Sequence, residues 1–459
     1  MLRAVLTFLG NRFRKYLERQ VEAAHEAALK LDVKDNLVRM LMPPVPLSKV
    51  ATKEQELDFV EHRSPTYIPP MTDGVVEETL LAIHNANKPE PFDAAKIAEI
   101  CLNCAVAYLL RRDGEEWVLD FSRITLFPFR PLTVAQFRFD LERNTFSVID
   151  VGGRTHSPGD PTWETAITHV MAWTTIGVPS GAHNWVHFAL PDVAASAHER
   201  MAQGDTNVAR LLEPHLRFTN RINYQALWIQ RGSTNAPTLR KAMVPWISMP
   251  YYPDQFRGGI LRNTQRHYEN LPQHFELPRS LDARVPYFAF LREYYEVVER
   301  FATALDPALE EDAWNEFAQL VDRELPGFAA IPRVKALAVL IWQVGVVHIC
   351  DHLTFYPYAL AHGFMKVPPS LFTPFTQRDV SRHDRWKTRS FARTWVNFNP
   401  TPGLDQRLIN IDAYGFEPGG CASNAAQQFK TDLLDVDARL SAEGRALVPA
   451  ERMIQSICF

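Results

Sequence analysis

Two pairs of histidines, each pair spaced four residues apart, lie in apolar stretches of the sequence. His183 and His187 occur in SGAHNWVHFAL, and His348 and His352 occur in VGVVHICDHLTF. On an α-helix this spacing places two imidazole rings on one face, where they can bind one metal ion. The second pair belongs to a long apolar helix that should begin near Val334, where a polar ring without a partner would be costly to bury. The two pairs together predict one buried, histidine-rich metal site.

The residues around the histidines exclude two common classes of metal site. The zinc-protease motif His-Glu-x-x-His is absent, because neither His25-Glu26 nor His198-Glu199 is followed by a second histidine at the required position. A carboxylate-bridged di-iron bundle needs two Glu-x-x-His units, and the only unit found runs from Glu22 to His25. A mononuclear site remains, and neutral imidazole ligands leave zinc, copper and iron open at this point.

Helical periodicity covers most of the chain and predicts a mainly α fold with one large domain. A small β element is expected only near 117–151, where WVLDF, QFRFDL and TFSVIDV alternate and Glu142-Arg143-Asn144 forms a turn, which predicts a hairpin. A segment rich in proline and aromatic residues, 237–286, separates the helices. The predicted helices are 21–41, 75–112, 163–200, 205–231, 284–304, 308–322, 333–364 and 424–446.

Charge and cysteine content narrow the function further. The formal net charge is -4, with 49 basic and 53 acidic residues, so the chain has no broad basic field and nucleic acid is not an expected partner. Five cysteines are an odd number in a long chain and do not indicate a disulfide framework, which favours a reducing cytoplasm. Cys101 and Cys104 form a single Cys-x-x-Cys in an apolar stretch and are interpreted as core residues.

Residues 1–45 are interpreted as an N-terminal amphipathic helix or arm, and 46–459 as the catalytic domain. The apolar run that begins at Ala4 is short and lacks a small-residue cleavage site, so a secretion signal is not expected, and no other stretch is predicted to span a bilayer. Apolar residues at helical spacing stand beside several arginines in this segment. The helix either docks on the domain or lies on a membrane surface, where an apolar substrate would be found.

Beyond the histidines, the sequence resembles the lipoxygenase family from about Phe127 to the end. LFPFRPLTVAQFRFD and GDPTWETAITHVMAW resemble the family's approach to its first ligand helix, and ARLLEPHLRFTNRINYQA resembles a family segment that ends in Ile-Asn. IWQVGVVHICDHLTFYPY resembles the second ligand helix, in which His352 takes a place held by Asn, His or Ser. The final QSICF is similar to the family's Asn-Ser-Ile/Val-x-Ile. The resemblance is to bacterial-type members that lack the N-terminal β-sandwich.

The resemblance implies a non-heme iron site with one iron per chain. Its ligands would be His183, His187, His348, His352 and the terminal carboxylate of Phe459, and the same five residues would be the catalytic ones. The implied reaction removes a hydrogen atom from a polyunsaturated fatty acid and adds O2, which gives a hydroperoxide. Two alternatives stay open: a lipoxygenase-fold oxidase or hydroperoxide isomerase that acts on another apolar metabolite, and a non-catalytic lipid-binding protein.

The resemblance also assigns four residues to the substrate pocket. Ala226 stands where the family's Ala accompanies S and Gly accompanies R stereochemistry, which implies an S-hydroperoxide. Gln230 replaces a Leu that the family packs against the reacting carbon, with Ile229 adjacent, and Pro179 replaces a frequent Gln. A polar residue in this place implies a substrate that differs from the family's usual one.

Two further departures concern the metal site. The interval from His183 to His187 is one residue shorter than the family's usual spacing, which implies a regular helical turn where the family has a widened one. The terminal residue is Phe459 rather than Ile, which keeps the carboxylate but adds bulk. Both changes leave the expected set of ligands intact.

Overall fold

The computed structural model describes residues 94–114, 116–121, 135–140, 145–151, 154–202, 204–217, 219–220, 223, 262–361 and 406–457. The N-terminal arm lies outside these residues, so its proposed contact with membranes has no support in the structure. Ala226, Ile229, Gln230 and Phe459 also lie outside the described residues, and their roles stay predictions.

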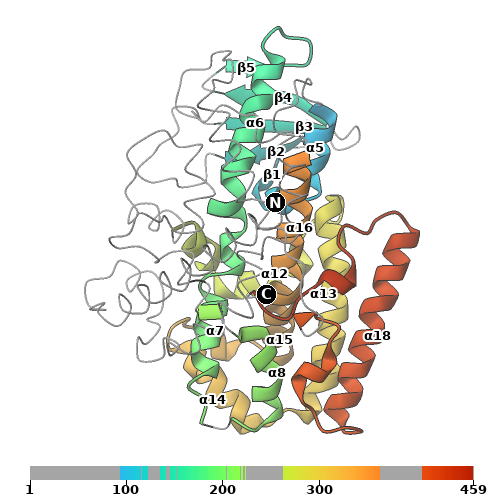
Figure 1. Ribbon diagram of the computed structural model, residues 1–459. Helices are drawn as coiled ribbons and strands as arrows, with labels where there is room; N and C mark the ends of the chain where they lie inside the picture. Colours follow the sequence, from blue (N-terminus) through green and yellow to red (C-terminus); the bar gives the residue numbers. More distant parts are fainter. Residues whose placement is uncertain are drawn as a thin grey trace, which may run out of the picture.

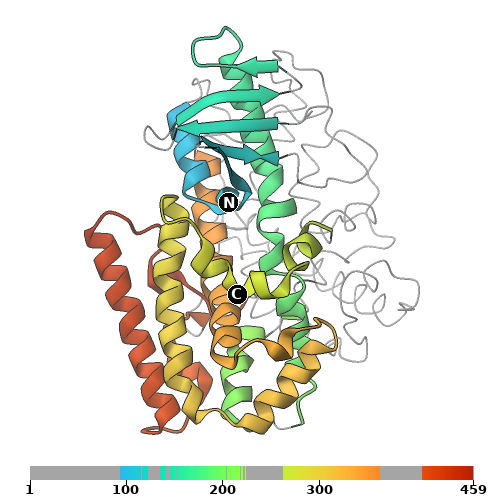
Figure 2. The same cartoon turned by 180° about the vertical axis from the view of Figure 1, so that it is seen from behind.

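The described residues form a mainly α fold with one small antiparallel sheet, which confirms the fold class predicted from the sequence. The α-helices are α5 Ala94–Leu102, α6 Trp163–Gly177, α7 Leu190–His198, α8 Asn207–Leu216, α12 Leu271–Ser280, α13 Pro286–Leu305, α14 Glu311–Asp322, α15 Arg333–Trp342, α16 His348–Ala361 and α18 Cys421–Ala442. The sheet lies at one end of the molecule, and α15 and α16 run through the middle of the molecule (Figures 1 and 2). Helices α13 and α18 lie side by side. Helices α13, α14 and α18 confirm the predictions at 284–304, 308–322 and 424–446.

Short turns of other helical types connect these elements. The 3-10 turns are η4 Ala105–Leu109, η7 Asn184–Val186, η9 Asp306–Ala308, η10 Phe328–Ala330, η14 Ile411–Tyr414 and η15 Ala450–Arg452. Two π-helical turns, η6 Val178–Ala182 and η11 Gln343–Val347, directly precede the two histidine pairs. Turns of this type often occur at functional sites.

Helix α13 shows how apolar spacing builds the helical part. Pro286 lies at its first position, where the missing N–H removes no intrahelical hydrogen bond. Buried residues such as Tyr287, Leu291 and Phe301 then recur on one side of the helix. Phe301 stacks on Phe429 of α18 with ring centroids 4.2 Å apart, which joins the two helices along their length.

The sheet is a meander of five strands in sequence order, β1 Leu110–Asp113, β2 Glu116–Asp120, β3 Ala135–Asp140, β4 Thr145–Val151 and β5 Arg154–His156. Strands β3 and β4 confirm the predicted hairpin, with Phe137 opposite Ile149. Both of these side chains are buried, and Phe121, next to β2, packs on Trp173 of α6 with ring centroids 5.7 Å apart. The sheet therefore supports α6, the helix that leads to the first histidine pair.

The helix predicted over 75–112 is wrong at its end. In the described part α5 stops at Leu102, and Leu110–Asp113 is strand β1, paired with β2. Cross-strand pairing outweighs the local helical pattern in this short polar strand, which has too few residues to show alternation.

Two further helical boundaries differ from the predictions. Helix α12 lies within 237–286, where no helix was predicted, and the side chain of Asn270 caps its first turn. Helix α8 ends at Leu216, inside the helix predicted over 205–231. In both places the capping residue and the backbone next to it decide where the helix begins or ends. The spacing of apolar residues does not predict these features.

The predicted helix over 333–364 is confirmed as α15, η11 and α16. Its part Arg333–Phe355 is long and apolar enough to cross a membrane, although no spanning stretch was expected there, and its apolar window is entirely buried inside the fold. The indole N–H of Trp342 donates to the carbonyl of Leu291 at 2.9 Å, which ties this run to α13. The apolar composition is therefore that of a core helix, and this core helix contains His348 and His352.

A glycine in η11 lets the last described residues approach this core helix. A Cβ atom at Gly345 would lie 3.0 Å from the carbonyl oxygen of Ile454 and 3.2 Å from a methyl group of Leu408. In turn the N–H of Ile454 donates to the carbonyl of Gly345 at 3.3 Å. The absence of a side chain at this position permits the close packing.

Candidate metal centre

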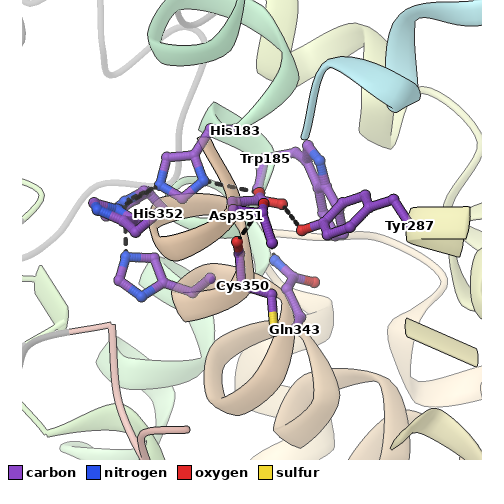
Figure 3. Close-up of polar contacts among 10 residues, drawn as sticks. His183, Trp185, Tyr287, Gln343, Cys350, Asp351 and His352 are labelled. Carbon is purple, nitrogen blue, oxygen red and sulfur yellow. Dashed lines mark hydrogen bonds and ion pairs between the residues drawn. The ribbon is translucent and has the colours of Figure 1, made fainter. Parts of the chain in front are cut away.

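The four predicted histidines converge on one buried point. Ring nitrogens of His183, His187, His348 and His352 all lie within 4.8 Å of one another. The Nε2 atom of His183 is 2.9 Å from that of His187 and 3.0 Å from that of His352, and His348 Nε2 is 3.1 Å from His187 Nε2 (Figure 3). The arrangement brings together ligands from two segments far apart in sequence, and it can hold a metal ion.

The first pair does not lie on a regular helical turn, and that prediction is wrong. His183 follows the π turn η6, and the 3-10 turn η7 lies between His183 and His187. The backbone then reverses at Ala189, whose φ of 69° is left-handed. The second pair, His348 and His352, does lie on a regular helix, α16.

A buried carboxylate holds the outer nitrogen of His183. Asp351 Oδ2 is 2.9 Å from His183 Nδ1, and Asp351 Oδ1 accepts a hydrogen bond from the hydroxyl of Tyr287 (Figure 3). Asp351 and Tyr287 are both 0 % exposed, so no solvent screens these contacts. Burial raises the pKa of Asp351 and the hydrogen bond from Tyr287 lowers it in part. A cation bound at the Nε2 atoms would favour the charged carboxylate and so oppose the effect of burial.

An amide holds the outer nitrogen of His187. Asn223 Oδ1 is 3.1 Å from His187 Nδ1, while its Nδ2 group donates to the carbonyl of His187 and to Asp192 Oδ1. These two acceptors fix the orientation of the amide, so Oδ1 faces the ring and His187 carries its proton on Nδ1. Burial raises the pKa of Asp192 to about 8, against a lowering by its contact with Asn223.

The proton positions test whether the cluster fits a metal ion. When Asp351 is ionised, the ring protons of His183 and His187 lie on Nδ1, facing Asp351 and Asn223, and both Nε2 atoms present lone pairs. In that state the two Nε2 atoms, 2.9 Å apart, cannot form a hydrogen bond with each other. A cation shared between them removes the repulsion, which is the arrangement of histidine ligands in metal sites. The donor set therefore fits a metal.

Burial also keeps the rings neutral, as metal binding requires. It lowers the pKa of His183 to about 3 and lowers the pKa of His187 and His348 well below the ordinary value. The neighbouring rings lower the last two pKa values further, because two imidazolium ions in the cluster would repel each other. The nitrogens are thus available to a metal ion without loss of protons.

A second buried network supports the turn between the first two histidines. The carbonyl of Trp185, in η7, accepts hydrogen bonds from Gln343 Nε2 and from the hydroxyl of Tyr268, both at 2.8 Å. Gln343 lies in η11 (Figure 3), and its Oε1 atom is 3.3 Å from His274 Nε2. The π turn of the core helix thereby holds the irregular turn of the other segment.

Comparison with known proteins identifies the fold. No protein-family model and no curated protein matches the sequence. A calcium-dependent 11R-lipoxygenase structure is similar with a TM-score of 0.62 at 15% identity, over 80% of this chain and 66% of that chain. The chain has a lipoxygenase-like fold. A coral 8R-lipoxygenase has a TM-score of 0.60 at 14% identity, over 89% and 75% of the two chains. The manganese lipoxygenase of Gaeumannomyces graminis has a TM-score of 0.55 at 14% identity, over 100% and 92%.

The lipoxygenase-like fold places the predicted residues as follows. The four histidines meet, and their role as ligands stays a prediction. Pro179 lies in η6, in the turn that leads to His183, and its place in a substrate pocket stays a prediction. Close to the last described residue, Ser456 donates to the carbonyl of Arg217, the residue that follows α8, at 2.8 Å.

Sequence reasoning missed the residues that hold the histidines. Asp351 stands between two predicted ligands in an apolar helix, and an acidic residue in such a run was a signal for a buried partner. Asn223 is the Asn of the family-like Ile-Asn, but no role was assigned to it. Tyr287 gave no signal, because an aromatic residue at helical spacing is usually a core residue.

His215 and His198 lie outside the cluster, and their contacts are those of structural histidines. His215 is 2.8 Å from the carbonyl of Gln455 through Nδ1 and 3.0 Å from the hydroxyl of Tyr414 through Nε2, so both of its nitrogens have protein partners. His198 Nε2 is 3.1 Å from the carbonyl of Ala209. These contacts support the structural interpretation of both residues.

Proposed function

We propose that the chain is a metal-dependent dioxygenase that converts a polyunsaturated fatty acid, with O2, into a hydroperoxide. The observation that carries this proposal is the convergence of four buried imidazoles inside a lipoxygenase-like fold, with neighbouring Nε2 atoms 2.9 to 3.1 Å apart. We assign one iron per chain. A similar structure is that of a manganese lipoxygenase, so manganese is the alternative metal to test.

The chain's own residues bind, orient and enclose the ion in this proposal. A bound iron supplies one-electron chemistry that can remove a hydrogen atom from a weak C–H bond. His183, His187, His348 and His352 would hold it through Nε2, and the carboxylate of Phe459 would complete the set. Apolar residues of the core helix, all buried, exclude water from the side of His348 and His352.

Metal content and oxygen uptake test the proposal together. Purified full-length protein is analysed for iron, manganese and zinc, and O2 consumption and conjugated-diene absorbance are followed with linoleic and arachidonic acids. H348A should lose metal and uptake. H198A is the matched control, because His198 is a histidine outside the cluster, and it should keep both.

Three outcomes separate the proposal from its alternatives. Stoichiometric iron or manganese with uptake supports it. Iron or manganese without uptake on either acid overturns the fatty-acid substrate and points to an oxidase or isomerase for another apolar metabolite. Zinc, or no metal, together with no uptake overturns the enzyme and favours a lipid-binding protein.

Two finer parts of the proposal rest on single features. We assign S stereochemistry from Ala226, so A226G should raise the share of R product in chiral analysis of the hydroperoxide. We also place the enzyme in a reducing cytoplasm. Cys101, Cys104, Cys350 and Cys421 are all free thiols, which supports that assignment.

A further inference from the structure

Asp351 contacts His183, one candidate ligand of the cluster, and lies on α16, the helix that supplies two other candidate ligands. It lies on α16 between His348 and His352, yet its side chain reaches His183, which is 168 residues away in sequence. The Nδ1 to Oδ2 distance is 2.9 Å, and the carboxylate is 0 % exposed. One turn of α16 therefore provides two candidate ligands and the partner of a third.

Tyr287 fixes the orientation of this carboxylate. Its hydroxyl donates to the second oxygen, Oδ1, so both oxygens of Asp351 have buried partners. The Tyr287 ring is itself packed edge-on against Tyr108, with centroids 5.9 Å apart, and it sits in the first turn of α13. The carboxylate therefore has little freedom to turn away from His183.

A charged acceptor and a neutral acceptor have different effects on an imidazole. Hydrogen bonds to a carboxylate are about twice as strong as those between neutral groups, and they increase the electron donation of the opposite ring nitrogen. His187, the neighbouring candidate ligand, has only the amide oxygen of Asn223 at its Nδ1. The two rings on this turn should therefore donate unequally to a shared ion.

We propose that Asp351, oriented by Tyr287, is a positioning residue that makes His183 a stronger imidazole donor than His187 and favours the trivalent state of the metal at the centre. This inference rests on the proposed function only in requiring a metal ion at the four histidines. A bound cation favours the ionised form of Asp351, and the negative charge then lies one imidazole ring away from the ion, where a buried charge is poorly screened. It stabilises the more positive oxidation state more than the less positive one.

Metal binding without substrate tests this role. Apo protein is titrated with Co2+ and Mn2+, the visible spectrum of the Co2+ form is recorded, and the iron form is titrated for its Fe3+/Fe2+ midpoint potential. D351N should weaken metal binding about 10–100-fold, change the Co2+ spectrum and raise the midpoint potential. Y287F should shift binding and potential in the same directions by less, because the carboxylate remains.

T354V is the matched control on the same helix. Thr354 is buried on α16 and donates to the carbonyl of Cys350 at 2.7 Å, so its loss changes a buried polar group of that helix. T354V should leave the spectrum and the potential unchanged. If D351N lowers the melting temperature but keeps wild-type affinity, spectrum and potential, Asp351 is only structural and the inference is wrong.

The result stays readable if one variant fails. Should D351N not fold, an unchanged potential and spectrum in folded Y287F would overturn the inference, and a shift would support it. A wild-type protein that binds metal but does not oxidise fatty acids refutes the proposed substrate and leaves this test intact. A wild-type protein that binds neither Co2+ nor Mn2+ refutes both.

Discussion

Two histidine pairs with the same four-residue spacing stand on different backbones. His348 and His352 lie on α16, where each carbonyl has a partner one turn further along. His183 and His187 flank the 3-10 turn η7, between a π turn and the left-handed Ala189. The rings nevertheless meet at one point, with Nε2 distances of 2.9 to 3.1 Å.

The difference shows how an irregular turn can hold metal ligands in place. The carbonyl of Trp185, in η7, and that of His187, which follows η7, accept hydrogen bonds from Gln343 and Asn223 of other segments. A regular helix needs no such support for its backbone. The backbone of the first pair is therefore held in position by side chains distant in sequence. The backbone of the second pair is held mainly by the burial of its own helix.

Removal of one histidine from either pair should have the largest effect on metal affinity, and the effect should be similar for the two pairs despite their different backbones. H187A and H348A each delete one ligand of a shared ion, so both should reduce metal affinity by more than about 100-fold, the upper range for loss of a supporting residue. Isothermal titration with Mn2+ measures this. A loss confined to one variant would mean that the pairs do not share an ion.

Asn223 tests the dependence of the first pair on distant support. N223A leaves the His187 carbonyl, His187 Nδ1 and Asp192 without their amide partner, so metal affinity should fall about 10–100-fold and stability by about 1–3 kcal/mol. N220A is the control, because the amide of Asn220 donates to Ser196 instead of to the carbonyl of His187. Equal losses in both variants would show a general packing effect.

His215 sharpens the comparison as a buried histidine with protein partners on both nitrogens. Burial lowers its pKa to about 4 in the folded protein, from 6.5. As pH falls, His215 therefore takes up its proton in the unfolded chain before it does so in the folded protein. The contribution of neutral His215 to the free energy of unfolding, up to about 3 kcal/mol, is fully present above pH 6.5 and is lost as pH falls toward 4. H215N should reduce the slope of unfolding free energy between these pH values. An unchanged slope in urea denaturation would contradict the assignment.

Gln343 should give the smallest effect, because Tyr268 still supports the same carbonyl. Q343L removes one of two hydrogen bonds to Trp185 and leaves His274 Nε2 without its partner, which should cost about 1–2 kcal/mol in stability. Metal affinity should fall only a few-fold. Thermal unfolding of the apo and metal-loaded forms measures both. A loss as large as that of N223A would place the main support of η7 at Gln343.

The parts of the candidate metal centre that could be predicted are those that depend on residues close together in the sequence. His348 and His352 stand in a run so apolar that both the core helix and a buried metal site follow from it. The spacing of His183 and His187 predicted their common direction but not the π and 3-10 turns, because hydrogen bonds from distant side chains decide the backbone there.

The remaining features depend on contacts across long sequence separations. The partnership of His183 with Asp351 spans 168 residues, and neither local periodicity nor spacing can encode it. Strand β1 is four residues long and polar, so only its pairing with β2 makes it a strand. The fold class was nevertheless predictable, because it depends on the sum of many apolar patterns.

The separation of His183 from Asp351 also has a consequence for biosynthesis. A ribosome that adds about 5–20 residues per second needs roughly 10–30 s to extend the chain by the 168 residues from His183 to Asp351. During that time the nascent chain exposes one pair of imidazoles without its carboxylate or the second pair. Divalent ions bind such imidazoles in an order set by the metal and its concentration. We therefore expect the metal content of the purified protein to depend on the ion supply of the host cell as well as on the finished set of candidate ligands.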